Sequence, residues 1–330
     1  MSNVSCVLDS WEFYCYFTFM KTLQFIAAIV VVALIFGATN SINAQPGMQQ
    51  PEFIRKAQPL LREGKFDEAL AIYQAELDKD PKSMPALNAS GVALDLKGNG
   101  IEARKFFARA IEAAPTDQAK ANAQRQMAMS YGFEGDCKNT VKYEQMVFDY
   151  WVTKKDFYQQ GEMYNEAARV CIDSGDLKTA EKYYVLGKKF GIQEPNINPN
   201  RVGLWDFRTE HALARLAARR GQKAKAQKHV AAAKDILDKN PEMAKAQAVF
   251  FPYLTGYVAF YGKDYKTALT DLLKANQNDA FIQCLLGQTY EKLGQPEKAK
   301  EMYVKASQVT GHNPPAAFAK PFTRKKLAQL

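Results

Sequence analysis

The sequence is poor in the residues that carry out most enzyme chemistry. It has three histidines in 330 residues, and none of them belongs to an HExxH motif or another paired spacing. GxSxG, P-loop and dinucleotide-binding patterns are absent as well. Acidic residues are numerous, but they alternate with lysines at spacings of three and four, which is typical of solvated helix surfaces. We therefore expect a protein without catalytic activity, metal or cofactor.

Strand signals are also missing. Alternating runs of valine, isoleucine and threonine do not occur after residue 50, where alanine, leucine, lysine, glutamate and glutamine dominate. These residues favour helices, and a hydrophobic fraction of 47% is large enough for an extensive core. The composition predicts an all-α protein. Its formal net charge of +9 either favours acidic partners or serves solubility alone.

A long hydrophobic run occurs once, in FIAAIVVVALIFGA over residues 25–38. It is shorter than the roughly 20 residues that a membrane span needs. Lys21 precedes the run, and small and polar residues ending in Ala44 follow it, which is the pattern of a secretory signal peptide. We expect residues 1–44 to be a signal peptide that starts at Met20 and is cleaved after Ala44, with a short linker over 45–50. The mature chain would be periplasmic or secreted, without a stable membrane span. The alternative is an uncleaved N-terminal anchor.

Residues of the same kind recur 34 positions apart. The pairs with this interval are Ala57 and Gly91, Gly64 and Gly98, Ala69 and Ala103, Tyr73 and Phe107, and Pro81 and Pro115. This period predicts a unit of two helices joined by a turn. The small residue of the first helix marks seven such units: Ala57, Gly91, Ala128, Ala168, Ala214, Gly256 and Gly287.

Each position of the unit has a physical role. A glycine ends the first helix by adopting a left-handed conformation. The small residue of the first helix is expected to face an alanine of the second helix, as Gly91 would face Ala103. An apolar residue four positions after the alanine would fill the space against the next unit, and Glu144 breaks this rule in the third unit.

With these features, residues 51–313 resemble the tetratricopeptide repeat (TPR) family, as an exported protein of bacterial type. The resemblance implies a right-handed superhelical solenoid of about seven helix pairs, whose concave groove is lined by the first helix of each pair. It also implies a non-catalytic scaffold that binds a protein or peptide. Two alternatives remain open: an accessory protein that associates with carbohydrate or the cell wall, and a degenerate enzyme on an α-solenoid.

Mapping the family pattern onto this sequence places polar and aromatic side chains in the groove. They are Asn88, Arg125, Asn165, Arg169, Arg208, His211, Arg215, Tyr253, Tyr257, Phe260 and Tyr261. Arginine holds carboxylate or phosphate through two parallel hydrogen bonds, so an acidic protein segment suits this surface. No nucleic acid is expected, because the export signal argues against it. Alternatively, the arginines pair with neighbouring carboxylates and the aromatic residues belong to the core.

The cysteines allow one disulfide after the signal peptide. Cys137 begins the second helix of the third unit, and Cys171 lies late in the first helix of the fourth, so the two are expected to be neighbours. A Cys137–Cys171 bond would leave Cys284 as a buried thiol. The alternative is that these cysteines are buried thiols that behave as small hydrophobic residues.

The tail, residues 314–330, does not follow the repeat. Pro314, Pro315 and Pro321 predict that no long helix passes through it. Phe318 and Phe322 suit a cap over the last unit, and a free docking motif is the alternative.

Overall fold

Short local signals end each helix and begin the next. The computed structural model describes residues 50–329, and in this range glycines with positive φ follow the first helix of six pairs: Gly64, Gly98, Gly135, Gly175, Gly221 and Gly294. In the sixth pair Lys263 adopts this conformation, with φ of 66°. The helix after the turn is often capped by a side chain, as where Asp136 Oδ1 accepts the Asn139 N–H at 3.0 Å. The predicted turns are confirmed.

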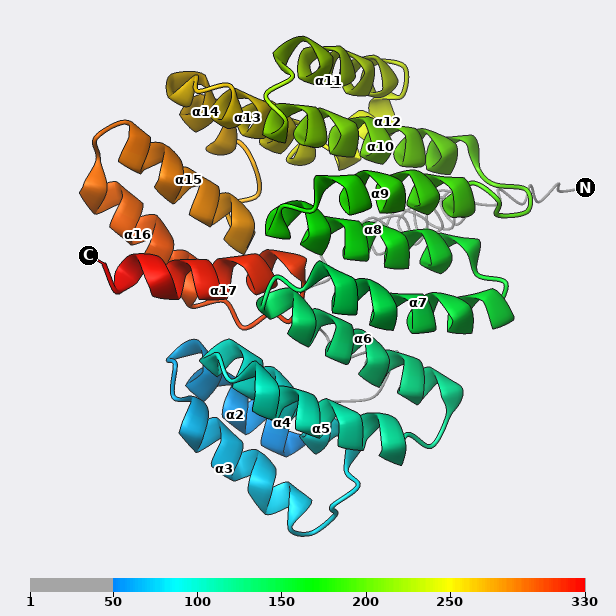
Figure 1. Ribbon diagram of the computed structural model, residues 1–330, viewed down its shortest axis with the longest axis vertical. Coiled ribbons are helices and arrows are strands. Elements are labelled where there is room, and N and C mark those ends of the chain that lie inside the picture. The colour runs from blue at the N-terminus through cyan, green and yellow to red at the C-terminus, as the bar shows by residue number, and fades with distance from the viewer. Residues whose placement is uncertain (1–49, 330) are drawn as a thin grey trace, which may run out of the picture. The chain divides into compact units, whose positions relative to one another are not determined.

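The described residues form helices and no strand (Figure 1). The helices are α2 (Glu52–Arg62), α3 (Phe66–Leu77), α4 (Met84–Lys97), α5 (Gly100–Ala113), α6 (Asp117–Phe133), α7 (Cys137–Thr153), α8 (Phe157–Ser174), α9 (Leu177–Gly191), α10 (Pro199–Arg219), α11 (Lys223–Asp238), α12 (Pro241–Ala246), α13 (Phe250–Tyr261), α14 (Tyr265–Leu272), α15 (Ala280–Lys292), α16 (Pro296–Ser307) and α17 (Pro314–Leu327). Seven packed pairs follow one another, from α2 with α3 to α15 with α16, and α12 connects the fifth pair to the sixth. The predicted all-α solenoid of seven helix pairs is confirmed.

The predictions for the N-terminal segment lie outside the described residues. They are the signal peptide over 1–44, its cleavage after Ala44 and nearly all of the linker over 45–50. Within residues 50–329, none of the helices combines the length and the apolar character that crossing a bilayer requires.

The nearest neighbours of three first-helix glycines lie sixteen positions later in the chain. The three atoms closest to a Cβ atom built on Gly91 of α4 belong to the Phe107 ring of α5, whereas the sequence predicts Ala103 opposite Gly91. Gly256 meets Leu272 and Gly287 meets Tyr303 in the same way, again sixteen positions later. The reason is geometric: a large side chain of the second helix lies over the backbone of the first and needs the space that a missing side chain leaves. Ala103 is itself buried in the same cluster.

Cys137 and Cys171 form a disulfide that joins the start of α7 to the end of α8. Cys284, on α15, is a buried free thiol. The structure therefore has the predicted pairing, and the bond ties the third helix pair to the fourth.

The tail contains a 14-residue helix, α17, so the prediction that prolines prevent a long helix there was wrong. Pro314 and Pro315 occupy the first turn, where a backbone N–H has no helical partner to lose. Pro321 lies inside the helix. Phe318 packs on Phe281 with ring centroids 4.8 Å apart, and Phe322 packs on Tyr303 at 5.7 Å. The tail thus covers the last helix pair, as the cap alternative expected.

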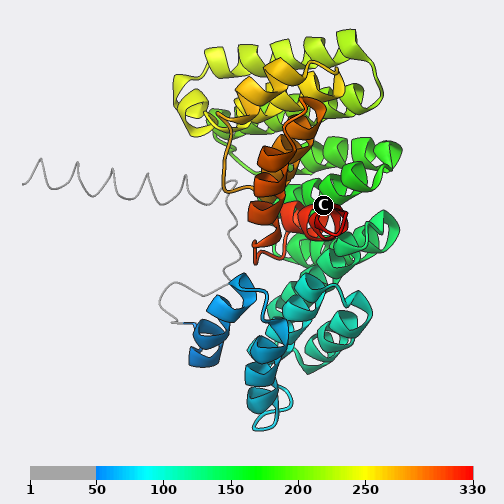
Figure 2. The ribbon, with the colours of Figure 1, turned by 90° about the vertical axis from the view of Figure 1, so that its left-hand side faces the viewer.

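The position of α17 goes beyond a cap. It contacts α15 and α16 of the last pair, and also α6 and α8 of the third and fourth pairs. Figure 2 shows it end-on, at the label C, between α15 and the green helices. The C-terminal helix therefore lies across the solenoid and joins its last pair to its middle.

Candidate functional site

The first helix of each pair lies on the inner side of the solenoid. In the fifth pair, α10 buries eleven residues and its partner α11 buries three. The helix α17 contacts the first helices of the third, fourth and seventh pairs, which are α6, α8 and α15. All residues predicted for the groove lie on first helices, namely α4, α6, α8, α10 and α13. The structure therefore places them on successive helices of one face, but their exposure differs.

Two of the predicted arginines are neutralised by acidic residues of the same face. Arg125 Nη2, on α6, lies 2.7 Å from Glu166 Oε2 on α8. Arg208 Nη1, on α10, lies 2.5 Å from Glu162 Oε1, and the Arg208 side chain is only 7% exposed. These ion pairs match the alternative in which arginines neutralise neighbouring carboxylates.

Several other predicted contacts are part of the packing. Tyr253 and Tyr257 are buried in a core cluster with Phe281, and Phe260 and Tyr261 pack against that cluster. The core alternative therefore describes these aromatic residues. The two predicted asparagines, Asn88 and Asn165, are half-buried.

His211 is buried and uncharged at neutral pH. Its Nε2 lies 3.3 Å from the Phe250 carbonyl oxygen. Burial, and then the positive charge of Arg215, hold the pKa of His211 well below its ordinary value. It contributes no cation to the face.

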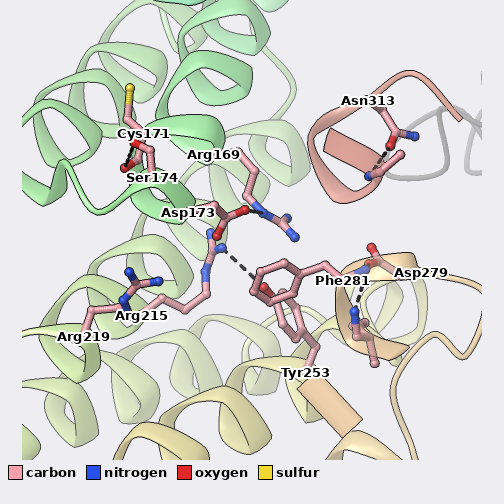
Figure 3. A network of polar contacts seen from close by, with 12 residues as sticks. Arg169, Cys171, Asp173, Ser174, Arg215, Arg219, Tyr253, Asp279, Phe281 and Asn313 are labelled. Carbon is pink, nitrogen blue, oxygen red and sulfur yellow. Dashed lines mark hydrogen bonds and ion pairs between the residues drawn. The ribbon is translucent and has the colours of Figure 1, made fainter. Parts of the chain in front are cut away.

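The positive charges of three arginines act on one buried carboxylate, and we call these four residues the arginine cluster: Arg169, Asp173, Arg215 and Arg219 (Figure 3). Arg169 Nε lies 3.5 Å from Asp173 Oδ2 on the same helix, α8. Arg215 and Arg219 reach the cluster from α10. The predicted residues Arg169 and Arg215 are therefore brought together.

Aromatic residues surround the arginine cluster. Arg215 donates hydrogen bonds to Tyr184 Oη at 3.0 Å and to Tyr253 Oη at 3.4 Å. Arg169 stacks on Phe281 of α15, with its Cζ 4.9 Å from the ring centroid. A guanidinium that stacks on a ring keeps its N–H groups in the plane, directed sideways. The stacking therefore fixes the Arg169 guanidinium without using its donors.

Donors remain unused in this cluster. Within the described residues, Arg169 Nη2 and Arg215 Nε are buried and donate no hydrogen bond. A buried charged donor without an acceptor is costly, roughly 1–3 kcal/mol or more. Both oxygens of Asp173 are likewise buried without a hydrogen bond from any described residue, so the donors and acceptors of the cluster do not satisfy one another, and the arginines can donate to a further acceptor.

The charges of the cluster are not balanced. The carboxylates of Asp173 and Asp279 both act on Arg169, and Asp173 also interacts with Arg215 and Arg219. Asp279 already caps α15, where its Oδ1 accepts the Phe281 N–H at 2.8 Å. Burial raises the pKa of Asp173, and this effect outweighs the opposite effect of the three arginines. An anion bound here would offset the repulsion among the cations.

Five residues of this site are not predicted by the sequence pattern: Asp173, Tyr184, Arg219, Asp279 and Phe281. Two of them had a usable signal, because Asp173 follows Arg169 and Arg219 follows Arg215 by four positions, on one helix face. Phe281 and Asp279 come from α15, more than a hundred positions from Arg169, and no local pattern indicates that contact.

Residues 50–329 contain no group of three His, Cys, Asp or Glu side chains that could hold a metal ion. The arrangement of the arginine cluster suits binding of an anion.

Two segments match family models described as tetratricopeptide repeat. The first match covers residues 54–118, which hold the first two helix pairs, and the second covers residues 282–311, in the seventh pair. No curated protein matches the chain.

Solved structures with similar folds include a tetratricopeptide repeat protein from Parabacteroides merdae, at 15% identity and a TM-score of 0.45, covering 77% of this chain and 91% of that one. RapI in its apo form is similar at 9% identity and a TM-score of 0.47, covering 84% of this chain and 98% of that one.

Proposed function

Since this chain is a tetratricopeptide repeat protein, we propose that it is a non-catalytic scaffold that binds a protein or peptide partner on the inner face of its solenoid. The fold is that of protein-interaction scaffolds in general. The arginine cluster would hold an acidic segment of the partner. The observation that carries this proposal is the pair of unused guanidinium donors, Arg169 Nη2 and Arg215 Nε.

The chemistry of the cluster selects the ligand. A carboxylate or phosphate offers several acceptor oxygens and a negative charge, and guanidinium groups bind both. The rings of Tyr253 and Phe281 already contact the Arg169 guanidinium, with ring centroids 5.8 and 4.9 Å from its Cζ. An acidic side chain of a partner would therefore meet donors that are already fixed, so that binding costs little side-chain entropy.

We place the function outside the cytoplasm, in the cell envelope or the extracellular space. Two features support this part of the proposal. The hydrophobic run over residues 25–38, followed by small residues up to Ala44, has the pattern of an export signal. The Cys137–Cys171 disulfide is a bond that persists in oxidising compartments.

The binding proposal can be tested with a fluorescein-labelled octamer of glutamate, titrated with the protein and followed by fluorescence anisotropy. An octamer of glutamine serves as the uncharged control probe. Arg169→Met combined with Arg215→Met removes two charges and keeps apolar volume against Phe281. We expect this double variant to bind the glutamate probe at least about tenfold more weakly, since charge-assisted hydrogen bonds contribute roughly 1.5–3 kcal/mol each.

Arg220→Met is the matched control variant. Arg220 follows Arg219 directly, but its Nη1 pairs with Glu181 at 2.7 Å. Binding of the glutamate probe by this control should be unchanged, and all variants are compared by far-ultraviolet circular dichroism and melting temperature. Equal binding of the glutamate and glutamine octamers, or undiminished binding by a folded double variant, would contradict the proposal.

A further inference from the structure

The C-terminal helix α17 occupies part of the inner face through contacts that reach far along the chain. Arg324 Nη2 donates to the Leu96 carbonyl oxygen on α4 at 3.1 Å. Just before the helix, His312 Nε2 lies 2.8 Å from Asp95 Oδ2, and both side chains are buried. Lys326 Nζ lies 2.7 Å from Glu291 Oε2 on α15. Polar side-chain contacts thus bind the C-terminal segment to α4 and α15, in the way that a separate helical ligand would be bound.

The face of α17 that meets the solenoid consists of small residues. Ala316, Ala317, Ala319 and Thr323 are between 0% and 2% exposed. A Cβ atom built on Gly132 of α6 would lie 3.6 Å from the Ala317 Cβ, so the two helices approach closely here. The surface beneath α17, on α4, α6 and α8, is therefore shaped to accept a helix.

The fit of α17 to this surface is incomplete. Lys320 is 6% exposed and its Nζ donates to the Ser307 carbonyl oxygen at 2.7 Å, yet burial, followed by the charge of Arg324, lowers its pKa to about 8. Pro321 interrupts the hydrogen bonding inside the helix. An open pocket of about 240 Å³ lies between α17 and the ends of α6 and α8, lined by Phe133, Val170, Ala317 and Phe318 among others. The buried ammonium and the proline weaken the packed position of α17 relative to a helix without them, and the pocket leaves part of this contact open to solvent.

We propose that the surface beneath α17 is a second docking site, and that its external ligand is a helix of a partner protein with the chemistry of α17. Such a helix presents a stripe of small residues and a basic last turn. It binds when α17 swings away, and α17 is its internal competitor. This inference goes beyond the acidic ligand of the arginine cluster. The two sites adjoin, because Asp173 also lines the pocket beside α17 and Phe318 packs on Phe281, but the docking surface binds a helix rather than an anion.

The charges of the surface set the direction of the partner helix. The Leu96 carbonyl lies in the last turn of α4, where the helix dipole is negative. Glu291 adds a carboxylate near the same end of α17. A partner helix therefore places its basic turn where Arg324, Lys325 and Lys326 now lie, and its small residues against α6 and α8.

The test uses the full chain and a fluorescein-labelled synthetic peptide of residues 313–329 as the probe. Arg324→Ala weakens α17 in the chain, whereas the peptide keeps its own arginine. We expect this variant to bind the peptide about tenfold more tightly than the parent, because apparent affinity rises with the fraction of open molecules. Lys325→Ala, which removes an exposed charge of the same turn, is the matched control and should bind as the parent does.

A second variant locks α17 in place. The 3.6 Å separation at Gly132 and Ala317 suits a disulfide, so the double variant Gly132→Cys, Ala317→Cys should lose peptide binding on oxidation. Ala317→Cys alone, treated with the same oxidant, should keep it. Undiminished binding by the oxidised double variant, or equal binding by Arg324→Ala and Lys325→Ala, would overturn the proposal. Elution of Arg324→Ala as a dimer would instead assign the surface to α17 of a second copy.

Discussion

A Cβ atom built on Gly91 would lie 2.5 Å from Cε1 of the Phe107 ring, so the ring rests on the backbone of α4. The same spacing of sixteen positions joins Gly256 to Leu272 and Gly287 to Tyr303. Where alanine replaces the glycine, as at Ala57 opposite Tyr73, both residues are still fully or almost fully buried. This contact closes the helix pair, and it predicts where added volume is least tolerated.

Replacing Gly91 by leucine should destabilise the protein by about 1–3 kcal/mol, the usual cost of overpacking a filled core. The leucine side chain has no space because Phe107 is itself 0% exposed and cannot move outwards without leaving the core. The measurement is the free energy of unfolding in urea, followed by circular dichroism. Substitution of the neighbouring Val92 by leucine, at a half-buried position, is the control and should cost less.

A double variant identifies the partner of Gly91. If Phe107 is the obstacle, Gly91→Leu should cost less in a Phe107→Ala background than in the parent. A larger coupling of Gly91 with Ala103 than with Phe107 would restore the pairing first expected from the sequence.

In the chain that begins at Gln45, we expect one reactive thiol under denaturing conditions without reductant. Cys137 and Cys171 are bonded, and Cys284 remains. Under native conditions Cys284 should react slowly, because burial raises its pKa far above that of an exposed thiol. Titration with a thiol reagent, before and after unfolding, measures both values. Three reactive thiols in the unfolded, unreduced chain would rule out the bond.

Export predicts a processed N-terminus. When the complete sequence is produced in a bacterium with a secretory pathway, mass spectrometry of the mature protein should find Gln45 as the first residue. Replacing Ala44 by a bulky residue such as tryptophan should block cleavage there, because signal peptidase requires a small side chain at that position. A mature protein that retains residues 25–38 would indicate an N-terminal anchor instead.

The helix pairs could be predicted from the sequence because their determinants are local. A turn glycine such as Gly98 and an apolar residue such as Phe107 lie within one unit of about 34 residues, so a period reveals them. The partner of Gly91 could not be derived in this way, because spacing alone does not show which residue of the second helix leans over the first.

The site and the tail depend on contacts that the period does not contain. His312 meets Asp95 across 217 positions, and Arg169 of the fourth helix pair meets Phe281 of the seventh. Both contacts exist because the solenoid curves and α17 crosses it. Pro321 predicts an interruption of any helix in the tail, whereas packing of α17 on both sides offsets the loss of a hydrogen bond. Tertiary contacts therefore determine the structure at positions where local sequence signals predict a different one.

The third helix pair contains an acid in the position where five of the other six pairs have an aromatic residue or leucine and one has valine. Glu144 lies sixteen positions after Ala128 and is 0% exposed. Within the described residues neither of its carboxyl oxygens accepts a hydrogen bond. Burial, and then the negative charge of Glu166, raise the pKa of Glu144 well above its ordinary value, against the opposing effect of Arg125.

Glu144→Gln should therefore stabilise the protein, and the gain should depend on pH. When an acid has a higher pKa in the folded protein than in the unfolded chain, the protein loses stability as pH rises, because the unfolded chain releases the proton first. Below the unfolded pKa of about 4.3 the parent and the variant should differ little. The advantage of the variant should grow as pH rises above that value and level off above the folded pKa. Urea unfolding at a series of pH values measures this difference, and Glu112→Gln, at an exposed position of α5, is the control that should show no such growth. If the parent instead gained stability relative to Glu144→Gln as pH rose, Glu144 would be ionised and paired in the folded protein, and its pKa would be lowered.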